Sequence, residues 1–489
     1  MVGEGEWESP GRRRFIEHDV GNQDIIKLVG EDIRQVPVTR SVRDANAAPP
    51  KFEWEIDITE AIMDSTGSGR RRFLKHAAAL AGAAAGAGAG AEWAARGQSA
   101  RSEGKSEASA KLEVQAKDAH DHRELLRRGA RFSVDHITYY TPLQDYAGII
   151  TPASLHFVQY HASHFPDIDG QQHRLTIHGM VDRPLSFSMD DLKRLPSVSR
   201  IHFLECHGNS SPMIHGTGNQ NMGLPVQYIH GMTSCSEWTG VPLSVLLNEV
   251  GVQRGGTWLV SEGADPGKFS HTLPLAKALE DVLVAYGQNG ETLRVEQGYP
   301  IRLLVPGWEA PFSVKYLSHI KVVDQPYHTW NEAMNHSVAR PDVSGKSRWY
   351  HFQFGPKSVI TRPSAGLKMP GRGYVQITGL AWSGGGVIRK VEVSTDGGKS
   401  WEEAKLQAPA LPRAHTRFNF DWAWNGEEAV LVSRSTDELG EVQPSRAELY
   451  KNWGISEEES KKPARAIHMN AQQPWRVARD GSIHDAMFS

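Results

Sequence analysis

Hydrophobic and polar residues alternate in short runs from about residue 126 onward, and this period of two predicts strands. One run ends at Leu204-Glu205 and is followed by a Gly208-Asn209 turn, which stops the strand. Two other runs flank Asn289-Gly290, a pair typical of a hairpin turn. The strand-like stretches of this region are residues 201–205, 282–286, 292–295, 301–305 and 313–323.

Helical segments lie between these runs. Ser188-Met189-Asp190-Asp191 has the form of a capping box, so we expect a short helix that stops at Pro196. A second helix is expected over residues 241–250, because Pro242 suits a helix start and Gly251 follows the last apolar residue. This mixture of strands and helices predicts an α+β domain over residues 126–326.

After about residue 345 the pattern changes to short strands separated by glycine-containing turns. The alternating runs are residues 374–379, 387–394 and 429–433, and the turns are Gly384-Gly385-Gly386 and Asp396-Gly397-Gly398. We therefore expect an immunoglobulin-like β-sandwich over residues 345–476, followed by a tail over residues 477–489.

The N-terminal quarter of the chain lacks such a core pattern. Residues 1–69 are polar and charged, and Met63 offers an alternative start. Arg70-Arg71, followed by Phe-Leu-Lys and a weakly apolar Ala/Gly-rich run, resembles a twin-arginine export signal over residues 70–96. An alanine-rich helix with a basic start is the alternative interpretation. Residues 97–125 have the composition of a linker, and no permanent membrane anchor is expected.

Charge and cysteine content narrow the functional classes. The net charge is −3 and the pI about 6.8, which argues against a general nucleic-acid binder. Cys206 and Cys235 are the two cysteines, too few for an iron–sulfur cluster, and no Cys-x-x-Cys-His haem motif is present. A disulfide between them is an alternative if the chain is exported. Redox chemistry would need another cofactor and a separate electron acceptor.

Cys206 is the most informative residue, because it stands directly after the strand at residues 201–205. A turn at that place would lift its sulfur into a cleft, where a thiolate suits a soft, high-valent metal. Taken alone, this motif is more commonly explained by a buried structural cysteine.

Several segments together resemble the sulfite oxidase family, whose cysteine binds molybdenum carried by a pyranopterin dithiolene. Within that family the chain looks most like the molybdenum subunit of sulfane dehydrogenases from bacterial sulfur-oxidising (Sox) systems. The resemblance covers roughly residues 135–476. Its segments are residues 140–144, 205–210, 234–243, 262–265, 288–291, 298–302, 313–315, 381–386 and 396–401.

The resemblance implies roles for individual residues. Cys206 is the expected molybdenum ligand and a catalytic residue. The residues expected to hold the pterin and its phosphate are Tyr160, His161, Asp265, Arg302, Ser313, Val314 and Lys315. Arginine and lysine supply charge-assisted hydrogen bonds to phosphate, and an aspartate accepts from pterin amino groups. Without the resemblance, Asp265 would be a turn residue, Lys315 a solvated strand lysine and His161 a loop histidine.

Three positions depart from the family pattern. Gln159, a second expected catalytic residue, replaces the arginine of Phe-x-Arg-x-His. Ser211 lies where sulfite-oxidising members carry another arginine. With Trp330 as the aromatic landmark, Asn335 takes the place of the catalytic tyrosine. These departures put ordinary sulfite oxidation in doubt.

The resemblance therefore implies an exported, periplasmic homodimer with a molybdenum–molybdopterin cofactor. The expected reaction is oxygen-atom transfer to reduced sulfur, with sulfane sulfur on a carrier protein as substrate and a c-type cytochrome as electron acceptor. Sulfite dehydrogenase is the alternative enzyme, and an inactive or cofactor-free binding and assembly subunit is the alternative of another class.

Overall fold

The computed structural model describes residues 131–132, 137–210, 223–339, 348–454, 456 and 468–487. The expected N-terminal extension, export signal and linker lie outside these residues, and so does Ser211. Among the helices of the described residues, none is long and apolar enough to cross a membrane.

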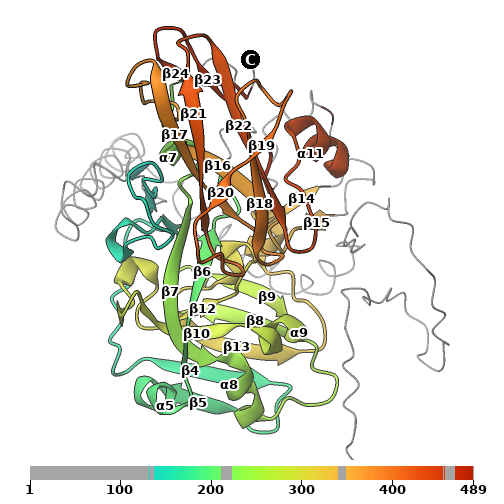
Figure 1. The fold of residues 1–489 in the computed structure, drawn as a ribbon. Helices are drawn as coiled ribbons and strands as arrows, with labels where there is room; N and C mark the ends of the chain where they lie inside the picture. Colours follow the sequence, from blue (N-terminus) through green and yellow to red (C-terminus); the bar gives the residue numbers. More distant parts are fainter. Residues whose placement is uncertain are drawn as a thin grey trace, which may run out of the picture. The chain divides into compact units, whose positions relative to one another are not determined.

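Three sheets make up the first part of the described chain (Figure 1). The smallest has the order β1 (Arg131–Phe132), β2 (Ile137–Tyr139) and β3 (Val158–Tyr160). The second has the order β11 (Glu291–Thr292), β10 (Leu283–Gln288), β7 (Thr233–Pro242) and β6 (Val198–Glu205), and β12 (Arg302–Leu304) also pairs with β10. The third has the order β5 (Leu185–Ser188), β4 (Arg174–Gly179), β13 (Leu317–Val323), β8 (Trp258–Gly263) and β9 (Ser270–Pro274).

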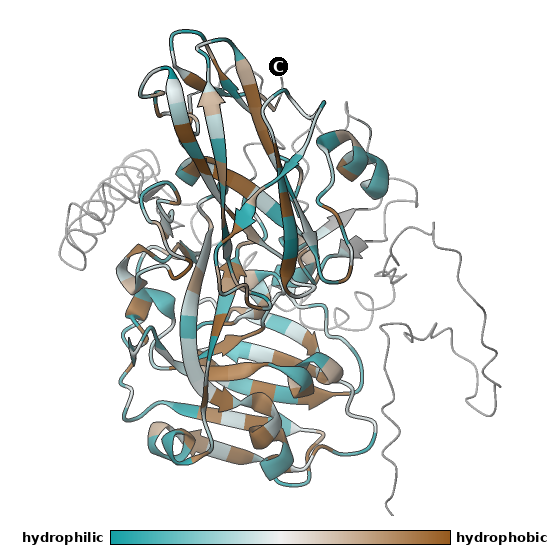
Figure 2. Ribbon diagram, in the orientation of Figure 1, coloured by the Kyte–Doolittle hydropathy of each residue, from teal (hydrophilic) through white to brown (hydrophobic). Residues whose placement is uncertain are grey.

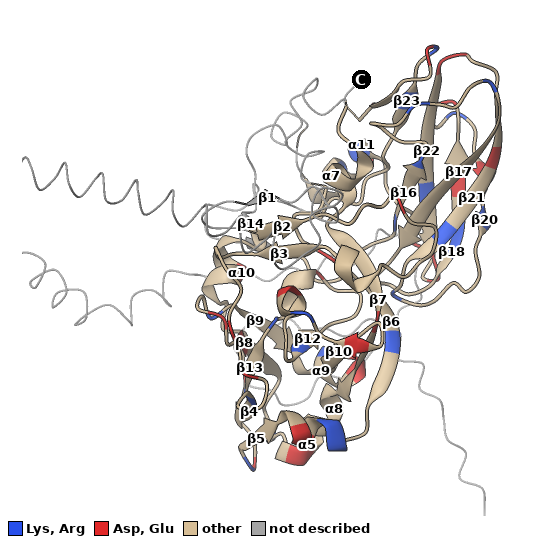
Figure 3. Ribbon diagram, turned by 90° about the vertical axis from the view of Figure 1, so that its left-hand side faces the viewer, with Lys and Arg blue, Asp and Glu red and all other residues tan. Residues whose placement is uncertain are grey.

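Short helices connect these strands. They are η1 (Ala153–Leu155), α5 (Met189–Arg194), α7 (Val226–His230), α8 (Leu243–Val250), α9 (Leu275–Glu280), η2 (Val295–Gln297), η3 (Ala310–Phe312) and α10 (Trp330–Met334). The capping box before α5 is confirmed, since Ser188 Oγ accepts from the Asp191 N–H and Asp191 accepts from the Ser188 N–H. Figure 3 shows acidic residues at the start of α5 and basic residues at its end, as the helix dipole favours.

The helix expected over residues 241–250 is also confirmed, although it begins two residues later than expected. Val241 and Pro242 end strand β7, and the helix α8 starts at Leu243. Its buried residues recur at helical spacing, and it stops where Gly251 adopts a positive φ of 68°. The hairpin is confirmed as well, because Asn289 and Gly290 both have positive φ between β10 and β11.

The strand expected over residues 313–323 is wrong in its first four residues. Ser313 to Lys315 form a loop after η3, and β13 begins only at Leu317. Tyr316 has a φ of 54°, which no extended strand allows, so the chain turns there. The turn directs the Lys315 side chain to the inside instead of to solvent.

Two further sheets form the second part, which has the expected sandwich architecture (Figure 1). One has the order β16 (Lys357–Arg362), β17 (Gly373–Trp382), β21 (Thr416–Trp424) and β20 (Lys405–Leu406). The other has the order β19 (Glu402–Glu403), β18 (Ile388–Ser394), β22 (Ala429–Asp437), β23 (Trp475–Val477) and β24 (Ile483–Asp485). Two further features occur in this part of the chain. They are a separate strand pair, β14 (Ser337–Ala339) with β15 (Arg348–Tyr350), and the helix α11 (Arg446–Trp453).

The residues expected to be a tail belong instead to this second sheet. β23 pairs with β22, and β24 pairs with β23 through Val477 and Ile483. Both of these side chains are buried, which explains why the chain returns to the sheet. Brown and teal segments alternate along the strands in Figure 2, as expected when one face of each sheet is buried.

Strand β6 lies between the two hydrophobic cores of the described chain. Phe203 packs into the sandwich core, with its ring 6.1 Å from Phe354 and 6.5 Å from Trp382. The next residue, Leu204, belongs to a second cluster that contains Trp238. Packing on both sides fixes the end of β6, and this is where Cys206 follows.

Candidate functional site

Cys206 is held at the end of β6 by backbone hydrogen bonds on both sides. Its N–H donates to Met232 O at 2.9 Å, and its carbonyl accepts from the Asn209 N–H at 2.9 Å, which closes the expected turn. The side chain is only partly buried. Burial raises the pKa of the thiol to about 11, the Gly208 N–H lowers it, and the carboxylates Glu309 and Glu205 raise it further. A metal cation would have to displace the proton for Cys206 to bind as a thiolate.

A buried ion pair supports the turn from the side of the sandwich. Glu205 Oε1 lies 2.6 Å from Lys357 Nζ of β16, and the two side chains are each 1% exposed. Trp382 Nε1 donates to the other carboxylate oxygen at 2.6 Å, and Asn209 Nδ2 donates to Oε1 at 2.8 Å. Lys357 also donates to Ser210 Oγ at 2.8 Å. The residues on both sides of Cys206 are thus fixed by side chains of the second domain.

Lys315 is a partly buried cation close to the cysteine. Its Nζ donates to the carbonyls of Glu296 at 2.8 Å and Gln159 at 3.3 Å. Burial and the neighbouring charge of Arg302 lower its pKa to about 7, whereas Glu296 and Cys206 act in the opposite direction. Gly298, with a φ of 106°, approaches so closely that a Cβ there would lie 3.0 Å from the Lys315 Cβ. The ammonium group keeps one donor for a ligand.

Arg302 is 2% exposed and lies over the ring of Trp238 at 5.2 Å. Its guanidinium donates to the carbonyls of Gln297 at 3.1 Å and Ser313 at 2.9 Å, so it holds the two loops that flank Lys315. Burial lowers its pKa to about 10. Part of its donor set remains for an anion.

Ser313 and Val314 precede Lys315 in the same loop and lie beside Arg302. Ser313 Oγ accepts from the Val305 N–H at 3.0 Å, and Val314 O accepts from the Leu303 N–H at 2.8 Å. Both side chains are buried. Their position beside Arg302 is fixed by β12, which runs next to them.

Tyr160 and Asp265 come together on another side. The Tyr160 ring packs against Tyr316 at 5.8 Å, and its buried hydroxyl has no hydrogen-bond partner in the described part of the chain. Burial and the charge of Asp265 raise its pKa. Asp265 is 6% exposed; burial raises its pKa, while the N–H groups of Phe269 and Gly267 lower it. Asp265 also makes the turn expected of it, since its carbonyl accepts from the Lys268 N–H at 2.9 Å.

The contacts of Gln159 and His161 relate less directly to their expected roles. Gln159 Oε1 accepts from Thr138 Oγ1 at 2.8 Å on the neighbouring strand, so its expected role toward the substrate stays a prediction. His161 is exposed, and its ring is parallel to that of Phe269 at 6.4 Å. Asn335 is exposed at the end of α10, whereas the next residue, His336, is buried.

The disulfide alternative is wrong, because both cysteines are free in the structure. Cys235 is completely buried on β7, and its sulfur accepts from the His415 N–H at 3.5 Å. Cys235 thus has the structural role, and Cys206 remains available as a ligand.

Sequence reasoning missed a cluster of buried histidines beside the cysteine. The His207 ring meets that of His336 at 5.6 Å, and His336 meets His271 at 5.3 Å. His207 directly follows Cys206, and His271 occupies a buried position of β9. The signals available in the sequence were the place of His207 directly after Cys206 and the place of His271 in a strand. Only the fold brings these two rings together with that of His336.

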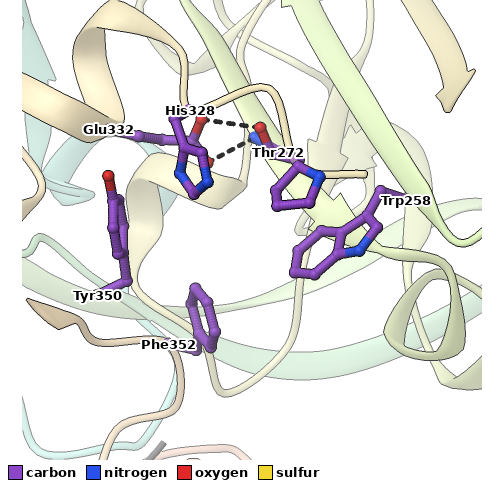
Figure 4. A pocket seen from close by; sticks show the side chains of 7 residues that line it. Trp258, Thr272, His328, Glu332, Tyr350 and Phe352 are labelled. Carbon is purple, nitrogen blue, oxygen red and sulfur yellow. Dashed lines mark hydrogen bonds between the residues drawn. The ribbon is translucent and has the colours of Figure 1, made fainter. Parts of the chain in front are cut away.

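Two buried glutamates fix this histidine cluster. Glu309 accepts from His207 Nδ1 at 2.7 Å and from His351 Nδ1 at 3.0 Å. Burial alone would raise the pKa of Glu309, but these histidines lower it to about 2. Glu332 accepts from the Thr272 N–H and hydroxyl, as Figure 4 shows, and its Oε1 lies 3.3 Å from His271 Nδ1.

These residues fit a molybdenum–molybdopterin cofactor. Cys206 offers a thiolate for the metal, and the partly buried Lys315 and the buried Arg302 are cations with donors left for a phosphate. The Tyr160 hydroxyl is a buried polar atom that a ligand would satisfy. The donor types and their burial thus match a soft metal at one end and an anionic group at the other.

Comparison with known proteins gives matches over both parts of the chain. Residues 161–331 match the family described as "Oxidoreductase molybdopterin binding domain", and residues 349–457 match the "Mo-co oxidoreductase dimerisation domain". The solved structure of the sulfane dehydrogenase SoxCD from Paracoccus pantotrophus is similar at 37% identity and a TM-score of 0.67. The match covers 73% of this chain and 90% of that chain.

Nitrate reductases are also among the relatives. The NADH nitrate reductase of Ulva prolifera is 32% identical over 338 residues, and that of Solanum lycopersicum is 30% identical over 339 residues. Each match covers 61% of this chain but only 38% and 36% of the respective relative, so the chain spans little more than a third of their length. The two domain matches and the extent of the SoxCD match show that this chain belongs to the sulfite oxidase family of molybdenum-cofactor oxidoreductases.

Proposed function

We propose that the protein oxidises reduced sulfur, with sulfane sulfur bound to a carrier protein as its substrate. The observation that carries this proposal is the similarity to a sulfane dehydrogenase over 90% of that chain. Each oxygen atom added to sulfur comes from water and releases two protons and two electrons. When bound, the molybdenum cofactor supplies this oxygen-atom transfer chemistry.

The chain's own residues would bind and orient the reacting groups. Cys206 would hold the metal, and Lys315 and Arg302 would hold the anionic end of the cofactor. The turn around Cys206 is fixed by Glu205, whose carboxylate is tied to Lys357 and Trp382 at 2.6 Å each. A fixed turn keeps the ligand geometry constant while the reaction proceeds.

The absence of the usual arginine at Gln159 supports sulfane over sulfite. Sulfite is a small dianion at neutral pH, and a charge-assisted hydrogen bond contributes about 1.5–3 kcal/mol to its binding. The loss of one such contact weakens binding roughly ten- to a hundredfold. A sulfane tethered to a carrier protein recovers affinity through contacts outside the pocket. Sulfite dehydrogenase remains the alternative enzyme.

The acceptor and the location are part of the same proposal. The sequence has two cysteines and no haem-binding motif, so electrons would leave singly to a c-type cytochrome. Arg70-Arg71 supports export of the folded, cofactor-loaded protein to the periplasm. The dimerisation-domain match supports a homodimer.

The test compares kcat/KM for a thiosulfate-loaded carrier protein, sulfite and nitrate, with cytochrome c as electron acceptor for the sulfur substrates. Molybdenum and pterin content are measured on the same preparation. We expect about one molybdenum per chain and the highest kcat/KM for the loaded carrier. Gln159→Arg should raise kcat/KM for sulfite roughly ten- to a hundredfold. Efficient sulfite oxidation by the wild type, unchanged by the substitution, supports the sulfite dehydrogenase alternative. A folded protein without molybdenum supports a binding subunit.

A further inference from the structure

Two buried histidines next to the cysteine have ring nitrogens that the protein leaves without partners. His271 Nε2 and His336 Nδ1 have no hydrogen-bond partner in the described part of the chain, and the side chains are 2% and 8% exposed. An unmade hydrogen bond on a buried polar atom is unfavourable. Next to an expected cofactor and substrate site, such atoms are candidates for contacts with a bound group.

The pair lies at the metal end of the site. His336 meets the ring of His207 at 5.6 Å, and His207 is the neighbour of Cys206 in sequence. On its other side His336 packs against Phe269 at 5.9 Å, and Phe269 lies parallel to His161 at 6.4 Å. A series of ring contacts through His336 thus connects the neighbour of the expected metal ligand with an expected cofactor residue.

Carboxylates act on His271, whereas the groups that act on His336 are other histidines. Glu332 and Glu309 act on His271 together with His207, and the groups that act on His336 are His271, His207 and His161. Burial lowers the pKa of both rings below the usual 6.5. Neither arginine nor lysine is among these groups in the described residues. The imidazoles are therefore neutral donors and acceptors in a weakly negative surrounding.

The carboxylates near the pair already have partners within the protein. Glu309 accepts from His207 and His351, and Glu332 accepts from Thr272. The unmatched nitrogens of His271 and His336 are thus candidates for hydrogen bonds to a ligand.

We propose that His271 and His336 are specificity-determining residues that hydrogen-bond the sulfur end of the substrate. The proposal rests on the proposed function and specifies it, because it names the substrate class by charge. Neutral donors, with two carboxylates near His271, suit a sulfur group with at most one negative charge, such as an S-sulfonate on an organic thiol. They disfavour a dianion, whose desolvation would lack a compensating cation.

The test uses S-sulfocysteine, a small S-sulfonate of an organic thiol, and sulfite as probes for the molybdenum-loaded protein. His336→Phe and His271→Leu remove the donors and should each raise KM for S-sulfocysteine about 2- to 10-fold, with kcat less affected. His336→Gln retains a donor and should stay within roughly threefold of the wild type. His336→Arg adds a cation and should raise kcat/KM for sulfite about tenfold or more.

A matched control is His202→Gln. His202 is 6% exposed, and its ring lies among the charges of Arg413, Arg200 and Lys277, outside the histidine cluster. Its substitution should leave KM unchanged. Molybdenum and pterin content are measured on every variant, because a role in holding the cofactor would lower them. Such a loss in His336→Gln would overturn the proposal.

A second readout separates this proposal from the proposed function. The dissociation constant of an unreactive alkyl sulfonate is measured by calorimetry on the loaded wild type and on the His271 and His336 variants. Weaker binding by the variants supports the histidine pair, even if the wild type does not oxidise S-sulfocysteine and the proposed function fails. Turnover by the wild type with unchanged KM and unchanged dissociation constant in the variants overturns the pair alone.

Discussion

Removal of Lys357 should destabilise the protein strongly, because it would leave a charged carboxylate buried beside the expected metal ligand, Cys206. Glu205 and Lys357 are 2.6 Å apart and each side chain is 1% exposed. Burial lowers the pKa of Lys357 and the charge of Glu205 raises it, so the charge of each group depends on the other. Loss of one partner of a buried pair costs about 3–5 kcal/mol.

The perturbation is Lys357→Met, which keeps most of the length of the side chain and removes the charge. At roughly 2–4 °C per kcal/mol, the expected fall in Tm is about 6–20 °C. Glu205→Gln alone should lower the Tm less than truncation of the Glu205 side chain, because the amide oxygen still accepts from Trp382. The double variant should recover much of the stability, because no uncompensated charge remains. The assay is thermal denaturation of the metal-loaded protein, with molybdenum content measured in parallel.

A surface ion pair provides the control. Lys390 lies 3.3 Å from Glu392 on β18, with 42% and 16% of the side chains exposed. Lys390→Met should cost no more than about 1 kcal/mol. If Lys357→Met melts like the wild type, or like Lys390→Met, the buried pair does not support the cysteine turn.

Four further outcomes are expected. Cys206→Ser should abolish turnover and the sulfur-to-molybdenum absorption while the Tm is kept; an unchanged absorption spectrum would assign the metal elsewhere. Stability should fall as the pH drops below 6.5, since burial lowers the pKa of His415 to about 3 and the unfolded chain binds the proton first. The free energy of unfolding should fall by on the order of 1.4 kcal/mol per pH unit per histidine. When the urea midpoint is plotted against pH between 7.5 and 5, His415→Gln should give a flatter slope than the wild type. Equal slopes for the two proteins would contradict this. Light scattering at micromolar concentration should give the mass of a dimer, and a monomer would count against the role of the second domain. The double substitution Arg70→Lys and Arg71→Lys should leave the cofactor-loaded precursor in the cytoplasm. Normal export of that variant would refute the twin-arginine export signal.

Local features of the fold could be predicted from the sequence wherever one short pattern decides the structure. The Ser188 capping box, the Asn289-Gly290 hairpin and the helix before Gly251 depend on neighbouring residues alone, and all three are confirmed. The turn after β6 followed from Gly208-Asn209 in the same way. Register with distant strands was not predictable, so the pairing of β23 with β22 was missed.

The candidate site was only partly predictable for the same reason. The resemblance identified Cys206, Arg302 and Lys315, but the alternating pattern placed Lys315 on a strand, where the positive φ of Tyr316 instead turns it inside. The histidine cluster depends on contacts between residues 207, 271 and 336, far apart in sequence. Asn335 was expected at the site, and the helix end exposes it and buries His336 instead.

The most direct test of the central claim is an anaerobic single turnover of the purified, molybdenum-loaded protein. The protein is mixed with one equivalent of thiosulfate-loaded carrier, sulfite or nitrate, and the absorption of the metal centre is followed. We predict that the loaded carrier reduces the centre fastest, that sulfite reduces it at least about tenfold more slowly, and that nitrate does not reoxidise the reduced centre. Faster reduction by sulfite, or reoxidation by nitrate, would contradict sulfane oxidation as the function of this protein.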